Sequence, residues 1–199
     1  MNDGVIKYKI EFRPTASCLS ACAYKRLEAV RSRLFALRLI GINEGIGYGN
    51  ISLKEEERFH ITGTQTGHLS TLKEEAYATV EEYSFTDFIL KAKGGMKPSS
   101  EAFSHAMIYE ISPRIKAVIH IHSKPLWKYM INNAYPFTTA EYGTKKMTEE
   151  IATLFTCKDP FDVPMFVMKG HEDGVMVFGE SLEEAERCLY ALVGKFLYM

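Results

Sequence analysis

The amino-acid sequence predicts an α/β domain in which helices cover a mixed or largely antiparallel sheet. Segments with apolar residues at helical spacing alternate irregularly with short apolar runs that are typical of strands. Some of these runs are separated only by short polar turns, which indicates hairpins. The chain has 199 residues, 46% of them hydrophobic, so it can bury a substantial core. We therefore expect residues 1–199 to form a single domain.

The first half of the chain is predicted to begin with helix and to continue with strands. Residues 17–40 carry apolar side chains at helical spacing, and four glycines in 41–49 end that pattern in an expected tight turn. Four strands are expected next, the first two as a hairpin: residues 50–53, 59–62, 77–83 and 85–92.

The second half is predicted to alternate helices and strands. Pro98-Ser99-Ser100-Glu101 has the features of a helix start, with serine hydroxyls available as caps, and Ser112-Pro113 ends that helix. The remaining expected elements are strands at 115–122, 165–169 and 175–178 and helices at 124–132, 141–155 and 182–198.

Charge and apolar content exclude some classes of function. Lys+Arg is 24 and Asp+Glu is 25, so no global basic field favours a nucleic-acid partner. No apolar run is long enough to span a bilayer, which predicts no membrane segment or signal peptide and a cytoplasmic location. The four cysteines do not suggest a disulfide framework, and Cys18 and Cys22 are interpreted as buried thiols on one helical face.

The most informative stretch is 118–123, Val-Ile-His-Ile-His-Ser, in which two histidines alternate with apolar residues. Side chains at i and i+2 of a strand project from one face, so His120 and His122 are expected to lie side by side. Two neutral imidazoles on one face make half of a zinc site. The alternative is a pair of buried histidines bonded to backbone groups, because H-x-H is a short motif.

A third histidine, His171, follows the apolar run 165–168. Three nitrogen ligands at strand ends, with one coordination position open, are typical of a catalytic rather than a structural zinc. The predicted cofactor is therefore one Zn²⁺, or another divalent metal, per chain.

Glu101 and His105 lie at the start of the helix that precedes the H-x-H strand. A carboxylate at a helix N-terminus is kept ionised, and beside a metal it can act as a general base or as a ligand that moves aside. The alternative for Glu101 is simple helix capping. His105 is interpreted either as a supporting partner of Glu101 or as one half of an i,i+4 surface pair.

Five motifs in chain order resemble the class II aldolase/adducin family. They are Gly49-Asn50-Ile51-Ser52, Ile61-Thr62-Gly63-Thr64, Pro98-Ser99-Ser100-Glu101, His120-Ile121-His122-Ser123 and Gly170-His171. The resemblance covers residues 17 to 195, and the spacing from the glutamate to the H-x-H pair is typical of the family. It implies a three-layer α/β/α fold with a central, mostly antiparallel mixed sheet.

The resemblance also implies a metal-dependent aldehyde-lyase that acts on a small phosphorylated sugar or ketose. The three histidines would hold the metal, which stabilises the enediolate formed by C–C cleavage, and Glu101 would be the catalytic acid/base. A tyrosine commonly protonates the leaving aldehyde, and the candidates are Tyr142, Tyr190 and Tyr198. The implied phosphate-binding positions are Asn50, Thr64, Ser99 and Ser100.

Two departures from the family pattern concern substrate recognition. Gln65 stands where the family loop has glycine, and Glu172-Asp173 adds acidic residues beside the third histidine. Two other functions stay open. One is a dehydratase of the methylthioribulose-phosphate type, which uses the same histidines and glutamate; the other is a non-catalytic module as in adducin. The ribulose-phosphate 4-epimerases are a weaker match, because they typically have aspartate at the position of Glu101.

Enzymes that resemble this chain form ring-like homotetramers with active sites at subunit interfaces, so a homotetramer is expected. Aromatic residues gather after the ligand strand, and such residues are enriched in interfaces. They are Trp127, Tyr129, Tyr135 and Phe137. The alternative is that these rings fill the core of the monomer.

Overall fold

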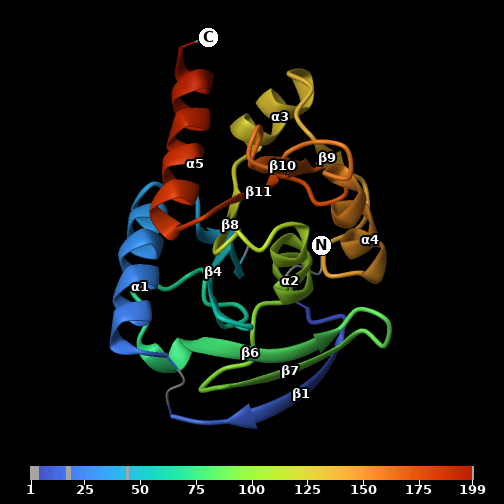
Figure 1. Cartoon of the computed structure of the whole chain (residues 1–199). Coiled ribbons are helices and arrows are strands. Elements are labelled where there is room, and N and C mark those ends of the chain that lie inside the picture. Colours follow the sequence, from blue (N-terminus) through green and yellow to red (C-terminus); the bar gives the residue numbers. More distant parts are fainter. Residues whose placement is uncertain (1–4, 17–18, 44, 199) are drawn as a thin grey trace.

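The computed structural model describes residues 5–16, 19–43 and 45–198. Its centre is a nine-stranded sheet in the order β1-β7-β6-β5-β4-β8-β11-β10-β9 (Figure 1). The strands are β1 (Lys9–Pro14), β4 (Asn50–Glu55), β5 (Arg58–Thr62), β6 (Tyr77–Ser84), β7 (Ile89–Gly94), β8 (Ala117–His122), β9 (Phe137–Thr138), β10 (Met165–Met168) and β11 (Gly174–Gly179). The β1–β7 and β9–β10 pairs are parallel and the other pairs are antiparallel. The expected mixed, mostly antiparallel sheet is confirmed.

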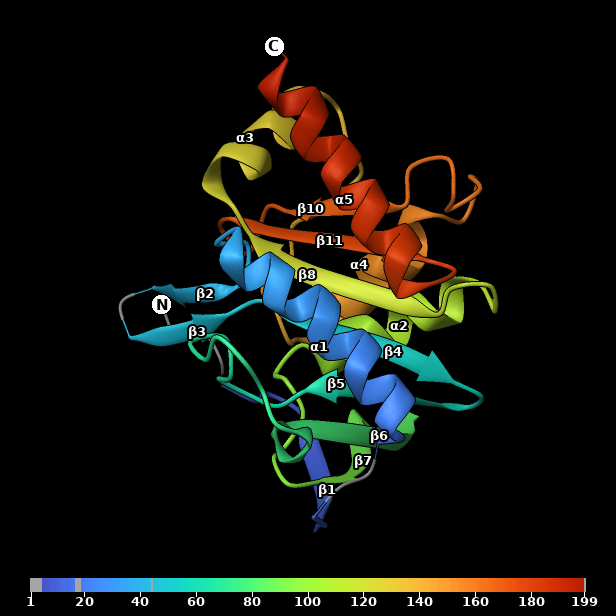
Figure 2. The ribbon, with the colours of Figure 1, turned by 90° about the vertical axis from the view of Figure 1, so that its left-hand side faces the viewer.

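Five α-helices cover the two faces of this sheet, which confirms the three-layer arrangement. They are α1 (Ala21–Ala36), α2 (Ala102–Ile111), α3 (Lys124–Asn132), α4 (Lys145–Leu154) and α5 (Leu182–Leu197), and a single 3₁₀ turn, η1 (Glu74–Ala76), precedes β6. Helices α1 and α5 lie in front of the sheet in Figure 2, with α2 and α4 behind it. None of the helices described is long and apolar enough to cross a membrane.

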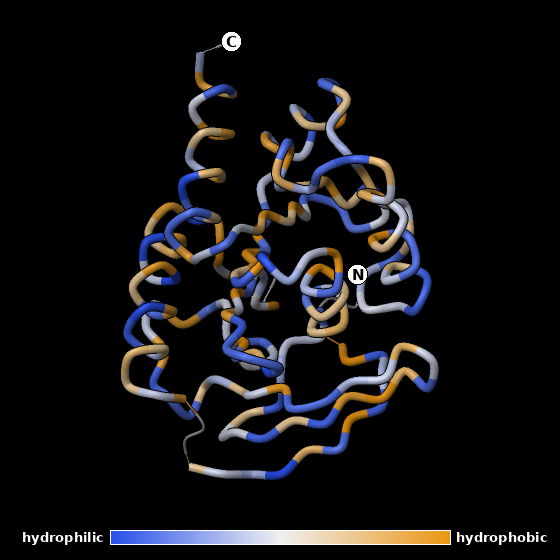
Figure 3. Tube along the Cα trace, viewed as in Figure 1, coloured by the Kyte–Doolittle hydropathy of each residue, from blue (hydrophilic) through white to orange (hydrophobic). Residues whose placement is uncertain are grey.

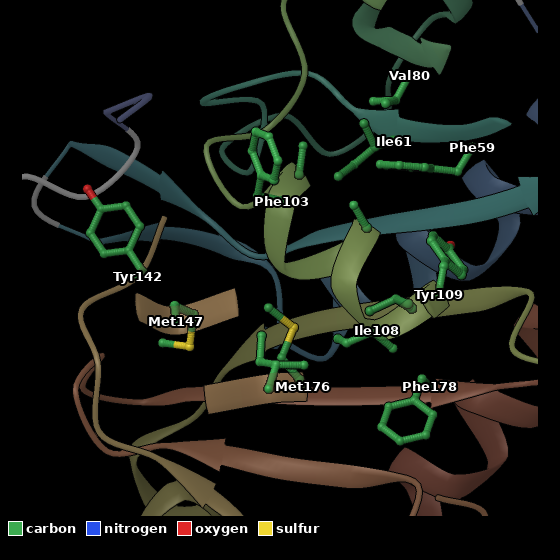
Figure 4. Packing of buried hydrophobic residues seen from close by; sticks show 14 of the residues in the cluster. Phe59, Ile61, Val80, Phe103, Ile108, Tyr109, Tyr142, Met147, Met176 and Phe178 are labelled. Atoms are coloured by element: carbon green, nitrogen blue, oxygen red, sulfur yellow. The ribbon is translucent and has the colours of Figure 1, made fainter. Parts of the chain in front are cut away.

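Alternation along the strands divides the core into two clusters. In β8, Ile119 and Ile121 face α1, α3 and α5, whereas Val118 faces α2 and α4. Hydrophobic and hydrophilic residues accordingly alternate along the helices and strands (Figure 3). In the cluster on the α2 side, Phe103 projects from α2 and Phe178 projects from β11 (Figure 4). Since His120 and His122 have the same parity as Val118, the fold directs both toward the α2 side.

The region 41–49 differs from the expected tight turn. It forms a two-stranded sheet, β2 (Gly41–Asn43) with β3 (Ile46–Tyr48), beside the main sheet. Gly49 then adopts φ 78°, a left-handed conformation that glycine reaches without steric cost, and it leads into β4. The region is thus a hairpin, with glycines of positive φ at 45 and 49, rather than one tight turn.

Several other elements differ from those predicted from the sequence. Strands β1 and β9 were not predicted, and β7 begins at Ile89 because 85–88 form the turn after β6. Helix α4 begins at Lys145 rather than at 141, since the Thr144 hydroxyl caps it by accepting from the Met147 N–H at 3.3 Å. Cys22 is exposed, so the prediction of a buried thiol there is wrong, and Cys18 lies outside the described residues.

Candidate metal centre and its cleft

Three histidines converge at one end of the central strands. His120 and His122 project from β8, and His171 lies in the turn between β10 and β11, where its N–H donates to the Met168 carbonyl at 3.1 Å. One ring nitrogen from each lies within 4.8 Å of the others. His120 and His171 are buried and His122 is half-buried. Local sequence placed the first two together, whereas the pairing of β8 with β11 brings in the third.

The donor set of this cluster fits a cation. The Nδ1 of His120 lies 3.2 Å from the Val175 carbonyl, which can only accept, so Nδ1 carries a proton and Nε2 faces the other ligand candidates. That Nε2 lies 3.0 Å from Nε2 of His122 and 2.8 Å from Oε2 of Glu101. Two imidazole nitrogens and a carboxylate oxygen therefore meet in one small volume, which a positive charge stabilises.

Burial and neighbouring charges shift the pKa values of His122 and Glu101 so that both can act as metal ligands. Burial, and then the neighbouring His120 and His171, hold the pKa of His122 well below its usual range, so its imidazole is neutral and able to ligate. Burial alone would raise the pKa of Glu101, but the adjacent histidines, His120 first, lower it below the ordinary value. Glu101, which is only 4% exposed, is thus an ionised carboxylate.

Glu101 does not act as a helix cap. It occupies the N-cap position of α2, but its side chain makes no capping hydrogen bond. Instead its Oε2 accepts from the Asn50 amide nitrogen at 3.0 Å and faces His120, while the buried Oε1 has no hydrogen-bond partner among the described residues. The start of α2 thus directs the carboxylate toward the histidine cluster.

His105 is buried rather than on the surface, which rules out the i,i+4 surface pair. Its Nδ1 lies 2.7 Å from the Ser52 hydroxyl, which in turn lies 2.6 Å from the Tyr109 hydroxyl. The Nε2 atom is buried and has no partner within the described part of the chain. Burial lowers the pKa of His105 to about 3, so this imidazole stays neutral at physiological pH.

The cleft beside the histidines brings together most of the predicted phosphate-binding residues. Asn50, Ser99 and Ser100 line it together with Glu101, His122 and His171. Thr64 is not among the lining residues, whereas its neighbours Gln65 and Thr66 are. The amide nitrogen of Asn50 is already engaged with Glu101, which leaves its buried Oδ1 without a partner among the described residues.

The structure shows the conformation of Gln65 and the ion pair of Glu172, two residues at which the sequence departs from the family pattern. Gln65 adopts φ 57°, a left-handed conformation that a glycine would reach more easily. Glu172 is exposed and pairs with Lys124 at 2.7 Å, and this hydrogen bond lowers its pKa. Its charge is thus balanced outside the cleft rather than directed at a ligand.

Two tyrosines lie beside the histidines, and only one was a candidate from sequence. The ring of Tyr142 lies 4.8 Å from that of His171, and Tyr142 appears at the edge of the labelled cluster in Figure 4. Tyr190 instead donates to Glu186 on α5, and Tyr198 is 94% exposed at the far end of that helix. Tyr48, which sequence reasoning missed, stacks on His122 with ring centroids 5.1 Å apart.

Comparison with known proteins supports the resemblance to this family. The family model of the class II aldolase and adducin N-terminal domain matches residues 32–127, a range that includes Asn50, Glu101 and both histidines of β8. The resemblance to the class II aldolase/adducin family is confirmed over this range. The other ligand candidate, His171, lies beyond the matched range and joins the site through the pairing of β11 with β8.

Members of the family with different reactions resemble this chain. It is 27% identical over 184 residues to 3-oxo-tetronate 4-phosphate decarboxylase of Haemophilus influenzae, covering 75% of this chain and 80% of that one. It is 24% identical over 176 residues to methylthioribulose-1-phosphate dehydratase of Leptospira biflexa, covering 72% and 82%. It is 29% identical over 153 residues to L-fuculose phosphate aldolase of Methanocaldococcus jannaschii, covering 69% and 75%.

A solved structure supports the fold of this chain. An L-fuculose 1-phosphate aldolase superposes with a TM-score of 0.65 at 20% identity, covering 89% of this chain and 84% of the other. At this identity the likeness concerns the fold alone. The fold and the resemblance to the family are therefore shown, whereas the reaction and the substrate need a separate argument.

Proposed function

We propose that this chain is a metal-dependent lyase of the aldolase type, which cleaves a small phosphorylated sugar or ketose. The observation that carries the proposal is the convergence of three imidazole nitrogens and the Glu101 carboxylate in one cleft. His120, His122 and His171 would hold the cation, with zinc preferred because three histidines with an open position suit it. A bound divalent cation supplies positive charge that stabilises an enediolate.

The residues of the chain divide the remaining work. In the cleavage direction the C–C electron pair passes to the carbon beside the ketone, while the hydroxyl on the departing carbon loses its proton and becomes the aldehyde oxygen. Glu101 is the candidate to exchange a proton with the first carbon, and Asn50 orients it through the 3.0 Å bond to Oε2. Tyr142 is the candidate to exchange the hydroxyl proton.

A phosphate group on the substrate is supported by the other wall of the cleft. Ser99 and Ser100 lie at the start of α2, where backbone N–H groups and the helix dipole favour an anion. Gly49 and Gly67 line the same cleft, so part of its wall is backbone rather than side chain. The names of the three relatives above all specify a phosphorylated substrate, which agrees with this inference.

Dehydration is the alternative reaction, and the dehydratase of Leptospira biflexa is the observation that favours it. The same carboxylate and histidines would then serve in removing water rather than in breaking a C–C bond. A non-catalytic adducin-like role is opposed by the buried Glu101, because an unused ionised carboxylate in this position would cost stability without a function.

An assay of the zinc-loaded protein against a panel of ketose and aldose phosphates tests the proposal. Release of dihydroxyacetone phosphate, followed through a coupled dehydrogenase, is the expected result. Mass spectrometry of the same mixtures would show the loss of water or of carbon dioxide from any substrate. A dehydrated or decarboxylated product without release of an aldehyde would overturn the aldolase assignment in favour of a relative's reaction, and no product from any sugar phosphate would contradict the whole proposal.

A further inference from the structure

The two histidines of β8 are held in different ways. His120 is buried, and its Nδ1 bonds to the Val175 carbonyl at 3.2 Å. The ring of His122 is half-buried, and among the described residues its only hydrogen-bond partner is Nε2 of His120. Metal-binding histidines usually donate their second N–H to a fixed acceptor, which sets the orientation of the ring. His122 therefore needs another means of orientation.

The ring of Tyr48 supplies that contact. It stacks on His122 with an interplanar angle of 24° and a centroid distance of 5.1 Å. His171 approaches the same imidazole edge-on, at 79° and 4.7 Å. The Tyr48 hydroxyl points elsewhere, because it donates to the Arg38 carbonyl at 3.3 Å. Tyr48 thus presents the face of its ring to His122, not an acid or base.

The backbone around Tyr48 is fixed by close glycine contacts. Tyr48 pairs with Gly41 across the β2–β3 hairpin. A Cβ atom at Gly67 would lie 2.6 Å from the Gly41 carbonyl and 2.6 Å from the Tyr48 nitrogen, and one at Gly47 would lie 2.9 Å from the Gly67 nitrogen. The hairpin therefore rests directly on the loop that contains Gly67, with no side chain between them.

That loop is in turn held by α1. The buried Arg31 donates to the carbonyls of Thr66 at 3.1 Å, Ser70 at 3.2 Å and Leu69. Glu28, one turn earlier on the helix, accepts from the Leu72 N–H at 2.9 Å. A continuous series of contacts thus runs from α1 through the loop and the hairpin to Tyr48.

We propose that Tyr48 is a positioning residue of the metal centre, whose ring sets the plane of the His122 imidazole in place of the missing hydrogen bond. The inference rests on the proposed metal site and adds a residue to it. Because the contact is aromatic stacking, phenylalanine at this position preserves it and leucine does not. Loss of such a supporting contact typically weakens metal binding by about 10- to 100-fold.

The test compares Tyr48→Phe, Tyr48→Leu and the wild type as metal-free proteins titrated with zinc against a chelating indicator. Tyr83→Leu is the matched control, since Tyr83 is also half-buried with its hydroxyl bonded, to Glu110 at 2.6 Å, but lies on β6 away from the cleft. We expect Tyr48→Phe and Tyr83→Leu to bind zinc like the wild type, and Tyr48→Leu to bind roughly 10- to 100-fold more weakly. The visible spectrum of the cobalt-substituted protein should change only in Tyr48→Leu.

Each outcome has a distinct meaning. A folded Tyr48→Leu protein with wild-type zinc affinity and an unchanged cobalt spectrum would overturn the positioning role while leaving the proposed function intact. Equal weakening in Tyr48→Phe would also overturn it, because the hydroxyl rather than the ring would then matter. Wild-type protein that binds no zinc would instead contradict the proposed function. If Tyr48→Leu fails to fold, Tyr48→Trp, which keeps an aromatic face, should retain the wild-type cobalt spectrum, and an altered one would count against the role.

Discussion

The carboxylate of Glu101 is the residue on which the proposed chemistry depends. Its Oε2 has Asn50 and His120 as partners, and its Oε1 has none among the described residues. Replacement by glutamine keeps the size of the side chain but removes the capacity to accept a proton. We expect Glu101→Gln to retain the metal and to lose about 10²- to 10⁴-fold in kcat. Wild-type turnover in this variant, measured with metal content in the same sample, would exclude Glu101 as the acid/base.

The buried His105 is expected to make the free energy of unfolding depend on pH. Its pKa falls from 6.5 to about 3 on folding because burial disfavours the charged ring. Below pH 6.5 the unfolded chain therefore binds a proton that the folded chain refuses, so the stability from His105 is complete above 6.5 and is lost as pH falls toward 3.

His105→Asn removes that titration and keeps a polar atom near Ser52. Between pH 7.5 and 5.0, the free energy of unfolding of the wild type should fall by about 2 kcal/mol more than that of the variant, at about 1.4 kcal/mol per pH unit below 6.5. Urea unfolding of both metal-free proteins at the two pH values measures this difference. If the free energies of unfolding of both proteins changed equally with pH, His105 would be protonated to the same extent in the folded chain as in the unfolded chain.

Sequence reasoning reached the titratable residues of the site but not all of their neighbours. The period of two along β8 was enough to pair His120 with His122, since side-chain alternation is a local property. The stacking of Tyr48 on His122 depends on how the β2–β3 hairpin packs against another segment, 74 residues from the histidine in sequence, and no local pattern encodes that.

At the scale of elements, α1 acts as a support for the loop beside the cleft. Arg31 is 1% exposed and donates to three backbone carbonyls, of which the Thr66 carbonyl belongs to a buried residue. Hydrogen bonds from a charged donor contribute about 1.5–3 kcal/mol each. Arg31→Leu should therefore lower the free energy of unfolding by about 3 kcal/mol or more.

Arg26→Leu on the same helix is the control for this prediction. Arg26 pairs with Glu183 at 3.1 Å, but both side chains are largely exposed, so its loss should cost no more than about 1 kcal/mol. Chemical denaturation of both variants measures the contrast. Similar losses in the two proteins would show that the buried carbonyl contacts contribute little to stability.

The elements themselves were predictable to different degrees. Helix α2 follows from local spacing, and α5 follows from spacing together with its cap, the Ser181 hydroxyl that accepts from the Glu184 N–H. Strand β1 carries an alternating pattern, Ile10 and Phe12 between charged residues, which could have indicated it. Its parallel pairing with β7, 80 residues away, could not be inferred from local sequence.

At the scale of the whole molecule, the aromatic segment after β8 remains the expected interface of a homotetramer. Trp127 already makes a contact within the monomer, because its indole N–H donates to the Met168 carbonyl at 2.9 Å. Phe137 is 44% exposed with Lys169 over its ring at 3.3 Å, which makes it the better probe of assembly.

We expect light scattering of the wild type to give the mass of a tetramer and Phe137→Glu to shift it toward smaller species, because a charge at the centre of an apolar contact is costly. Lys128→Glu, on α3 but exposed, is the control for a simple change of charge. An active wild-type monomer at the assay concentration would exclude assembly as a condition for function.

The metal content of the protein tests the central claim most directly. Wild type, Glu101→Gln and His122→Ala are each reconstituted with zinc, desalted and analysed for bound metal, with circular dichroism as the check on folding. Three converging imidazoles predict about one zinc per chain in the first two proteins and close to none in His122→Ala. Full zinc occupancy in a folded His122→Ala protein, or none in the wild type, would contradict the assignment of His120, His122 and His171 as the metal centre.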